Sequence, residues 1–372
     1  MKSTPLSAMV AFIACMLLTA CSGSRTSSAP ESVPALQEVF KDDFLIGTAM
    51  SAAQIGIRHE QENALIKKHF NAVTPENIMK AEIIHPEWNR YDFDMADKLV
   101  SYSQENGMRL NGHTLIWHSQ LPRFAQQIQS VDSFRTFFTE HIKTVASRYS
   151  GKLQSWDVVN EALNEDGTMR KSIFLEKLGA DYVTEAFRLT AEASPGTELY
   201  YNDYNNEQPA KRAGCIELIK KIRQAGVKID GVGIQGHWHA GKLPLQHIEE
   251  SILEYSALGL KVSFTELDIE VLPRDFQGAD VNQRMREDPA LNPYTSGLPD
   301  SVQLQLARDY EALFQLFLKH RDKIDRVTFW GVHDGQSWLN NWPVPGRTNY
   351  PLLFDRQYQP KPAFYSIVNL KK

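Results

Sequence analysis

The chain has 372 residues, of which 42% are hydrophobic and 23% are charged, an ordinary composition for a soluble globular protein. Its formal net charge is −5, and acidic and basic residues are interleaved along the chain rather than gathered in blocks. This balance excludes the basic surface of a nucleic-acid-binding protein and a polybasic membrane patch, and it favours a neutral polymer or a small molecule as the partner.

The first 20 residues have the pattern of an export signal. Lys2 is followed by an apolar stretch from Ala8 to Ala20, which is short for a bilayer span and suits the h-region of a signal peptide. The stretch ends in LTAC, which resembles the lipobox of bacterial lipoproteins. That resemblance implies cleavage before Cys21 and attachment of lipid to its sulfur. An ordinary secretory signal that is cleaved nearby is the alternative.

Residues 21–36 are rich in serine and proline and predict a flexible tether. With a lipid on Cys21, the sequence predicts an exported protein that is anchored to a bacterial membrane, at the outer membrane or cell surface, on the periplasmic or extracellular face. Only Cys215 then remains in the domain predicted over residues 37–372, so no intrachain disulfide can form. Cys215 shares helical spacing with Leu218 and Ile222, and we expect it to be a small buried hydrophobe.

Strand-like and helix-like segments alternate from residue 37 to residue 372. The strand-like segments are FLIGTAM (44–50), NAVTPENIM (71–79), RLNGHTLIW (109–117), SWDVVNEAL (155–163), ELYYNDY (198–204), GVGIQGHW (231–238), KVSFTELDI (261–269) and RVTFWGV (326–332). Apolar stripes at helical spacing lie between them, for example Phe134, Phe137, Phe138, Ile142, Val145 and Tyr149, and Leu306, Tyr310, Leu313, Phe314, Phe317 and Leu318.

This alternation predicts an α/β fold with parallel strands joined by right-handed crossovers. Eight such units in one chain of this length favour a single catalytic domain with the TIM (β/α)8 barrel fold. An open doubly wound sheet is disfavoured, because no glycine-rich phosphate loop follows any of the strands.

Polar and aromatic side chains collect where the predicted strands end, which is where a TIM barrel carries its chemistry. In chain order they are Glu76, Asn77 and Lys80; His113, Trp117 and His118; Asn160 and Glu161; Asn202, Asp203 and Tyr204; Gln235 and His237; Glu266 and Asp268; and Trp330. A single residue of this kind can be a satisfied core group. Seven strands that do so together are hard to explain by packing, since each buried polar group needs partners of its own.

Glu161 and Glu266 are the strongest candidates, because they end the fourth and seventh strands and converge over the barrel mouth. Two facing carboxyl groups, one protonated and one ionised, are the minimum equipment for glycoside hydrolysis. Asn160 is placed to bond a sugar hydroxyl. Gln235, His237 and Asp268 are placed to orient and charge-balance Glu266.

Two other chemistries fit less well. The histidines and glutamates include suitable metal ligands, but no HExxH motif or compact His/Cys cluster is present, and no metal or other cofactor is expected. A serine hydrolase is also disfavoured, because the sequence has no G-x-S-x-G elbow. The remaining groups suit a carbohydrate: Trp117, Trp330, Trp338, Tyr204 and Trp342 offer flat faces for sugar rings, and Glu76, Asn77 and Lys80 offer hydrogen-bond partners for hydroxyls.

At this point a resemblance is evident. The segments FNAVTPENIMK, RLNGHTLIWHSQLP, WDVVNEAL, YYNDYN, GVGIQGHWH, FTELDIE, TFWGVHDGQSWL and PLLFD, with KPAF after it, resemble glycoside hydrolase family 10, the endo-β-1,4-xylanases, in the family's order from about residue 44 to residue 364. The resemblance implies endo-acting hydrolysis of xylan or xylo-oligosaccharides by a retaining double displacement, in a monomer that needs no cofactor.

The resemblance also implies roles for single residues. Glu161 would be the acid and then the base, and Glu266 the nucleophile. The other implied contacts are Asn160 and Gln235 at the 2-hydroxyl and nucleophile, His237 with Asp268 behind it tuning the nucleophile, His113, Trp117, Trp330 and Trp338 around the scissile bond, Glu76, Asn77 and Lys80 on the next sugar of the non-reducing side, and Tyr204 on the leaving-group side.

Two features depart from the family pattern. Ala81 follows Lys80 where the family often has tryptophan, which affects packing near the distal sugar site. Residues 271–300 form a segment far longer than an ordinary βα loop, beside the expected nucleophile. This segment could extend the cleft, recognise side branches or bind a partner, or it could be a surface insertion without a catalytic role. A retaining β-1,4-glucanase and a non-catalytic glycan-binding lipoprotein are the functional alternatives.

Overall fold

The computed structural model describes residue 1 and residues 33–56, 59–276 and 278–372. The predicted signal peptide, its lipidation site at Cys21 and most of the predicted tether lie outside these residues. A compact unit runs from Pro34 to Lys372. No helix in the described part of the chain is both long and apolar enough to cross a membrane.

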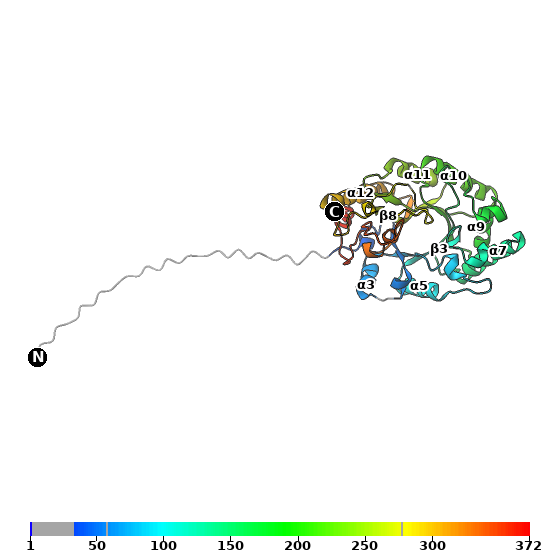
Figure 1. Ribbon diagram of the computed structural model, residues 1–372, viewed down its shortest axis with the longest axis horizontal. Helices are drawn as coiled ribbons and strands as arrows, with labels where there is room; N and C mark the ends of the chain where they lie inside the picture. Colours follow the sequence, from blue (N-terminus) through cyan, green and yellow to red (C-terminus); the bar gives the residue numbers. More distant parts are fainter. Residues whose placement is uncertain (2–32, 57–58, 277) are drawn as a thin grey trace. The chain divides into compact units, whose positions relative to one another are not determined.

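The compact unit is a barrel of parallel strands with helices around it, which confirms the predicted TIM barrel (Figure 1). The strands are β1 (Leu45–Met50), β2 (Ala72–Pro75), β3 (Arg109–Trp117), β4 (Ser155–Asn160), β5 (Glu198–Asp203), β6 (Gly231–Ile234), β7 (His237–His239), β8 (Lys261–Glu270) and β9 (Ile324–Phe329). Neighbours follow the order β6-β5-β4-β3-β2-β1-β9-β8, and pairing of β6 with β8 closes the ring. Short β7 pairs with β8 beyond β6, so the predicted sixth strand is split in two.

Helices connect successive barrel strands and cover the outside of the barrel. They are α1 (Leu36–Val39), α2 (Ala52–Ile55), α3 (Glu60–His69), α4 (Ala81–Ile84), α5 (Asp94–Glu105), α6 (Arg123–Gln126), α7 (Val131–Arg148), α8 (Ile173–Leu178), α9 (Tyr182–Ala193), α10 (Pro209–Gln224), α11 (Leu245–Ala257), α12 (Asp300–Lys319) and α13 (Pro362–Asn369), with single turns of 3₁₀ helix at η1 (Pro289–Leu291), η2 (Asp334–Gln336) and η3 (Trp338–Asn340).

The predicted apolar stripes are the inner faces of these helices. In α7 the stripe residues from Phe134 to Val145 are buried, and in α12 those from Leu306 to Phe317 are buried, while Leu318 at the end of the second stripe is only half-buried. Cys215 is buried in α10, as its spacing predicts. The core therefore lies between the helices and the barrel wall, which leaves the strand ends free for polar groups.

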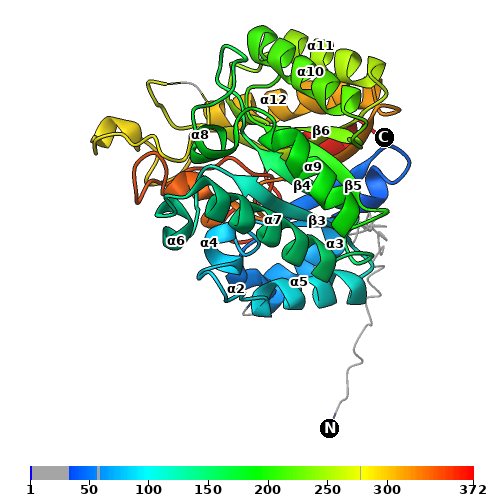
Figure 2. The ribbon, with the colours of Figure 1, turned by 90° about the vertical axis from the view of Figure 1, so that its right-hand side faces the viewer.

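The loops that carry the candidate residues gather at one end of the barrel. Figure 2 shows α6, α8 and the long yellow segment after β8 at this end. Several strands stop earlier than predicted, because the chain turns there to deliver side chains inward. β4 stops at Asn160, since Glu161 has a φ angle of 58°, a left-handed conformation that a strand does not contain. β2 likewise ends at Pro75, before Glu76.

Candidate active site

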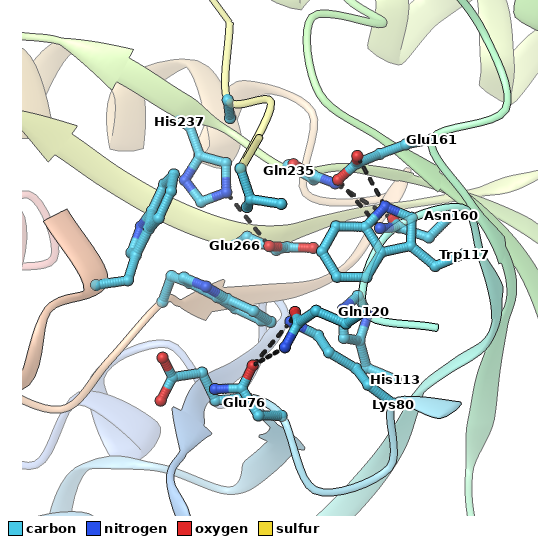
Figure 3. Close-up of a pocket in the computed structure, with 15 residues that line it drawn as sticks. Glu76, Lys80, His113, Trp117, Gln120, Asn160, Glu161, Gln235, His237 and Glu266 are labelled. Atoms are coloured by element: carbon cyan, nitrogen blue, oxygen red, sulfur yellow. Dashed lines mark hydrogen bonds and ion pairs between the residues drawn. The ribbon is translucent and has the colours of Figure 1, made fainter. Parts of the chain in front are cut away.

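A pocket lies at the carboxyl ends of the barrel strands (Figure 3). Its lining residues are Glu76, Asn77, Lys80, His113, Trp117, Gln120, Asn160, Glu161, Gln235, His237, Glu266, Ala279, Val281, Trp330 and Trp338. The barrel thus brings together both predicted carboxylates and all the predicted substrate-binding residues except Tyr204. Gln120, Ala279 and Val281 belong to the lining and were not predicted.

Glu161 is buried at the end of β4 and held by three hydrogen-bond donors. Trp117 Nε1 donates to its Oε2 at 2.9 Å, and its Oε1 accepts from Asn160 Nδ2 at 3.1 Å and from Gln235 Nε2 at 3.0 Å. Burial raises the pKa of Glu161 above its usual range, and the charge of Glu266 adds to this, against the hydrogen bonds from Gln235 and Trp117 and the charge of Arg170. This carboxyl group is therefore suited to hold a proton.

Glu266, on β8, has the opposite electrostatic environment. Burial by itself would raise its pKa, but the hydrogen bond from His237 and the charges of His113, His237 and Lys80 outweigh burial and lower the pKa below its usual range. His237 Nε2 lies 3.3 Å from Glu266 Oε2. Burial works to lower the pKa of His237, yet the adjacent Asp268 and Glu266 raise it to about 10, so His237 is a cation at neutral pH.

Asp268 holds this histidine in place from behind the pocket wall. Its Oδ1 accepts from His237 Nδ1 at 2.9 Å, and its Oδ2 accepts from Trp338 Nε1 at 2.8 Å. Trp338 is also stacked on Trp342, with ring centroids 4.6 Å apart. One carboxylate therefore fixes both the histidine beside Glu266 and an aromatic wall of the pocket.

Two asparagines connect the two carboxylates. Asn202 Nδ2 donates to Glu266 Oε1 at 2.8 Å and to Asn160 Oδ1 at 3.0 Å, and Asn160 in turn donates to Glu161. Thr265 Oγ1 donates to Asn202 Oδ1 at 2.6 Å, so the Asn202 amide is satisfied on both sides. Sequence reasoning noted Asn202 at a strand end but gave it no role. Gln235 was expected to orient Glu266; its backbone oxygen accepts from Glu266 N at 2.8 Å, while its side chain donates to Glu161.

The opposite side of the pocket carries a lysine among polar groups. Lys80 Nζ donates to Asn77 Oδ1 at 3.1 Å and to Gln120 Oε1 at 3.0 Å, and it lies 4.6 Å from the centre of a Trp117 ring. Burial lowers the pKa of Lys80, although the nearby carboxylates of Glu266, Glu76 and Glu161 oppose this. Burial raises the pKa of Glu76. Donors and acceptors therefore alternate along this side, as binding of sugar hydroxyls requires.

His113 is oriented by an acid inside the barrel. Its Nδ1 lies 2.9 Å from Asp157 Oδ2, which also accepts from Asn111 Nδ2 at 2.9 Å. The His113 ring lines the pocket next to Trp330, and the centroids of the two rings are 5.4 Å apart. Asp157 is the acidic residue in the otherwise apolar fourth strand, and its partners explain why it is tolerated there.

Tyr204 is the predicted substrate-binding residue that does not line the pocket. Its side chain is 4% exposed, its hydroxyl accepts from Arg170 Nη2 at 2.7 Å, and Lys211 Nζ lies 3.8 Å from its ring centre. Arg170 also donates from Nε to the backbone oxygen of Glu161 at 3.1 Å. Tyr204 is therefore close to Glu161 but covered.

No set of three or more His, Cys, Asp or Glu side chains that could hold a metal ion occurs among the residues that the structure describes.

Comparison with known proteins shows what this chain is similar to. The sequence profile of glycosyl hydrolase family 10 matches residues 35–370. Endo-1,4-beta-xylanase A of Xylanibacter ruminicola is 41% identical over 347 residues, which cover 91% of this chain and 94% of that protein. The beta-1,4-xylanase of Dictyoglomus thermophilum is 40% identical over 90% of this chain and 91% of that one. Among solved structures, a GH10 endoxylanase from a sugarcane soil metagenome superimposes with a TM-score of 0.87 at 41% identity, over 90% of this chain and all of that one.

Proposed function

This chain belongs to glycosyl hydrolase family 10, and we propose that it is an endo-acting xylanase that cleaves β-1,4-xylosidic bonds with retention of configuration. The observation that carries the proposal is the pair of buried carboxyl groups with opposite pKa shifts in one pocket. A protonated acid and an ionised nucleophile at the same pH are what double displacement requires.

In the first step, an oxygen of Glu266 attacks the anomeric carbon while Glu161 protonates the glycosidic oxygen. The carbon–oxygen bond to the leaving chain breaks, and a glycosyl ester forms on Glu266. The hydrogen bonds indicate which oxygen carries the proton. Glu161 Oε1 accepts two amide donors, whereas Oε2 accepts only the Trp117 indole, so Oε2 has the free lone pair.

In the second step, Glu161 is ionised and takes a proton from water, whose oxygen attacks the anomeric carbon and releases Glu266. The negative charge of Glu266 is one of the causes that raise the pKa of Glu161. Because the first step removes this charge, it lowers the pKa of Glu161. Formation of the ester therefore favours the ionised form of Glu161 that the second step needs.

The pocket walls support xylose as the sugar unit. Trp338 is fixed by Asp268 and by stacking on Trp342, so it cannot easily yield to a larger ring substituent. Xylose lacks the hydroxymethyl group that glucose carries at C6. The pocket that Trp338 lines together with Lys80 and Trp330 is expected to accept xylose and to clash with glucose.

The direct test is release of reducing ends. We expect the wild-type chain to act on linear xylan and to be far less active on a β-1,4-glucan or a mixed-linkage glucan. Glu266→Ala should abolish the release from xylan without loss of the folded state by circular dichroism. Binding of xylan by the wild type without any release of reducing ends would contradict the proposal and favour a glycan-binding protein.

We further propose that the protein is exported, that lipid is attached at Cys21, and that the residues from there to 33 form its tether, since the compact unit begins at Pro34 and Leu36, which was expected to end the tether, is buried at the start of α1. The apolar segment, the LTAC sequence and the Ser/Pro-rich stretch support this. Cys21→Ser should move the protein from the membrane fraction to the soluble exported fraction, and an unchanged membrane fraction would contradict lipid attachment. We propose that the protein is a monomer. Sedimentation velocity checks this.

A further inference from the structure

The long segment after β8 reaches into the catalytic pocket. We call residues 278–282 of this segment the strap. Two strap side chains, Ala279 and Val281, are part of the pocket lining, and Ala279 is 3% exposed. In Figure 3 the yellow segment enters from the side of His237 and Gln235, opposite Glu76 and Lys80. The strap therefore lies at the end of the pocket away from Glu76 and Lys80.

The strap is fastened to loops that follow two other strands. Asp280 Oδ2 accepts from Arg170 Nη1 at 3.3 Å, and Asn282 Nδ2 donates to Ser119 Oγ at 2.8 Å. Arg170 follows β4 and Ser119 follows β3, whereas the strap comes from the segment after β8. These contacts hold the strap beside Glu161, because Arg170 is bonded to the Glu161 backbone oxygen at 3.1 Å.

The strap also covers the aromatic residue expected on the leaving-group side. A methyl group at Gly278 would lie 3.1 Å from Cε2 of Tyr204, and the φ angle of Gly278 is 89°, so glycine lets the backbone pass this close to the ring. Together with Lys211 and Arg170, this contact leaves Tyr204 only 4% exposed. A sugar that leaves past Glu161 meets the strap rather than the open face of Tyr204.

The strap side chains in the pocket lining cannot form hydrogen bonds with a sugar. On the opposite side, Glu76, Asn77 and Lys80 offer donors and acceptors to hydroxyl groups. The strap contributes only the small apolar side chains of Ala279 and Val281 to the lining, which fill space and offer no hydrogen bond to a sugar. We propose that the strap is a specificity-determining wall that limits the length of xylan chain bound on the leaving-group side. This inference rests on the proposed xylanase activity.

The test removes both fastenings with Asp280→Ala/Asn282→Ala and follows xylohexaose labelled at its reducing end. We expect the wild type to release short labelled products, xylose and xylobiose, and the double variant to shift the cleavage towards longer ones. The kcat/KM for xylohexaose should rise by about tenfold, the scale on which contacts in a pocket discriminate between substrates. With 4-nitrophenyl β-xylobioside, whose leaving group is one ring, kcat/KM should change by less than about threefold.

Two further variants keep the result interpretable. Val281→Ala trims the wall without touching either fastening, and it should move the products in the same direction by a smaller amount. Asp288→Ala removes a carboxylate from the same long segment, outside the strap. Within the described ranges, Asp288 Oδ1 accepts only from the nearby Ala290 N, at 2.8 Å, so this variant should leave the products unchanged. An unchanged pattern in both strap variants, or a shift to shorter labelled products, would overturn the inference. If the wild type cleaves neither substrate, the proposed function fails instead.

Discussion

At the scale of single residues, the site depends on two glutamates that are held in opposite protonation states. Both are buried, and burial raises the pKa of a carboxyl group in each case. They differ in what surrounds them. Glu161 has neutral indole and amide donors, whereas Glu266 has the imidazolium of His237 within 3.3 Å. The charge of Arg170 also acts on Glu161 but does not outweigh its burial, so the hydrogen-bonded imidazolium beside Glu266, rather than the degree of burial, decides which glutamate is ionised.

The first residue-scale prediction concerns the acid. Glu161→Gln removes the transferable proton but keeps the side-chain shape. We expect kcat/KM for xylohexaose to fall by about 10²–10⁴-fold, because general acid catalysis contributes a factor of this size. A 2,4-dinitrophenyl xylobioside needs little protonation of its leaving group, and its kcat/KM should fall much less. Initial rates on the two substrates check this.

Glu176→Gln, on the exposed surface of α8, is the control for that experiment and should change neither rate. Equal losses on the two substrates in Glu161→Gln would contradict the assignment of Glu161 as the acid.

The second residue-scale prediction concerns pH. Glu266 must be ionised, so kcat/KM falls as the pH drops through its pKa, and Glu161 must be protonated, so kcat/KM falls as the pH rises through its pKa. His237→Asn removes the cation that lowers the pKa of Glu266. The acid limb of the profile should therefore move to higher pH, by roughly one unit or more. His239→Asn, two residues along β7, should leave that limb in place. An acid limb that stays fixed in His237→Asn would show that this histidine does not tune Glu266.

At the scale of secondary-structure elements, the site depends on close packing between neighbouring strands. Gly233 of β6 pairs with Asn202 of β5, and a methyl group at Gly233 would lie 2.2 Å from Asn202 Oδ1. Asn202 links the two glutamates through its amide. The absence of a side chain on β6 therefore leaves room for the asparagine that positions Glu266.

The element-scale prediction is that Gly233→Ala displaces Asn202 and lowers kcat strongly. It should also destabilise the fold by about 1–3 kcal/mol, the usual cost of overpacking. Val232→Ala, whose side chain points to the other face of the same strand, is the matched control: it should lower the melting temperature without a comparable loss of kcat in the folded enzyme. Melting temperatures and rates below the transition check both. Full activity in Gly233→Ala would mean that Asn202 does not need its present position.

At the scale of the whole molecule, most of the architecture could be predicted from the sequence. Eight strand-like segments correspond to the closed ring of barrel strands. Strand ends were harder to predict, because a turn such as the one at Glu161 depends on a backbone angle that no residue pattern specifies. The pocket contacts of Gln120, Ala279 and Val281 could not be predicted, since they depend on where long loops fold back. The covered position of Tyr204 has the same cause.

A prediction at this scale is that the stability and activity of the barrel do not depend on the residues before Ser22. The compact unit begins at Pro34, so a chain that starts at Ser22 should have the melting temperature and the xylohexaose kcat/KM of the full-length protein. Calorimetry and initial rates on both chains check this. A lower melting temperature in the shorter chain would show that residues before Ser22 contribute to the fold.

The central claim is that Glu266 forms the glycosyl ester and Glu161 assists it. A 2-deoxy-2-fluoro xylobioside with a dinitrophenol leaving group tests this directly, because the fluorine slows both formation and hydrolysis of the ester, whereas the good leaving group speeds its formation alone, so that the ester accumulates. After digestion and mass spectrometry of the trapped enzyme, we predict the sugar on the peptide that carries Glu266, and no label in Glu266→Ala. Attachment to Glu161, Glu76 or any other side chain would contradict the account.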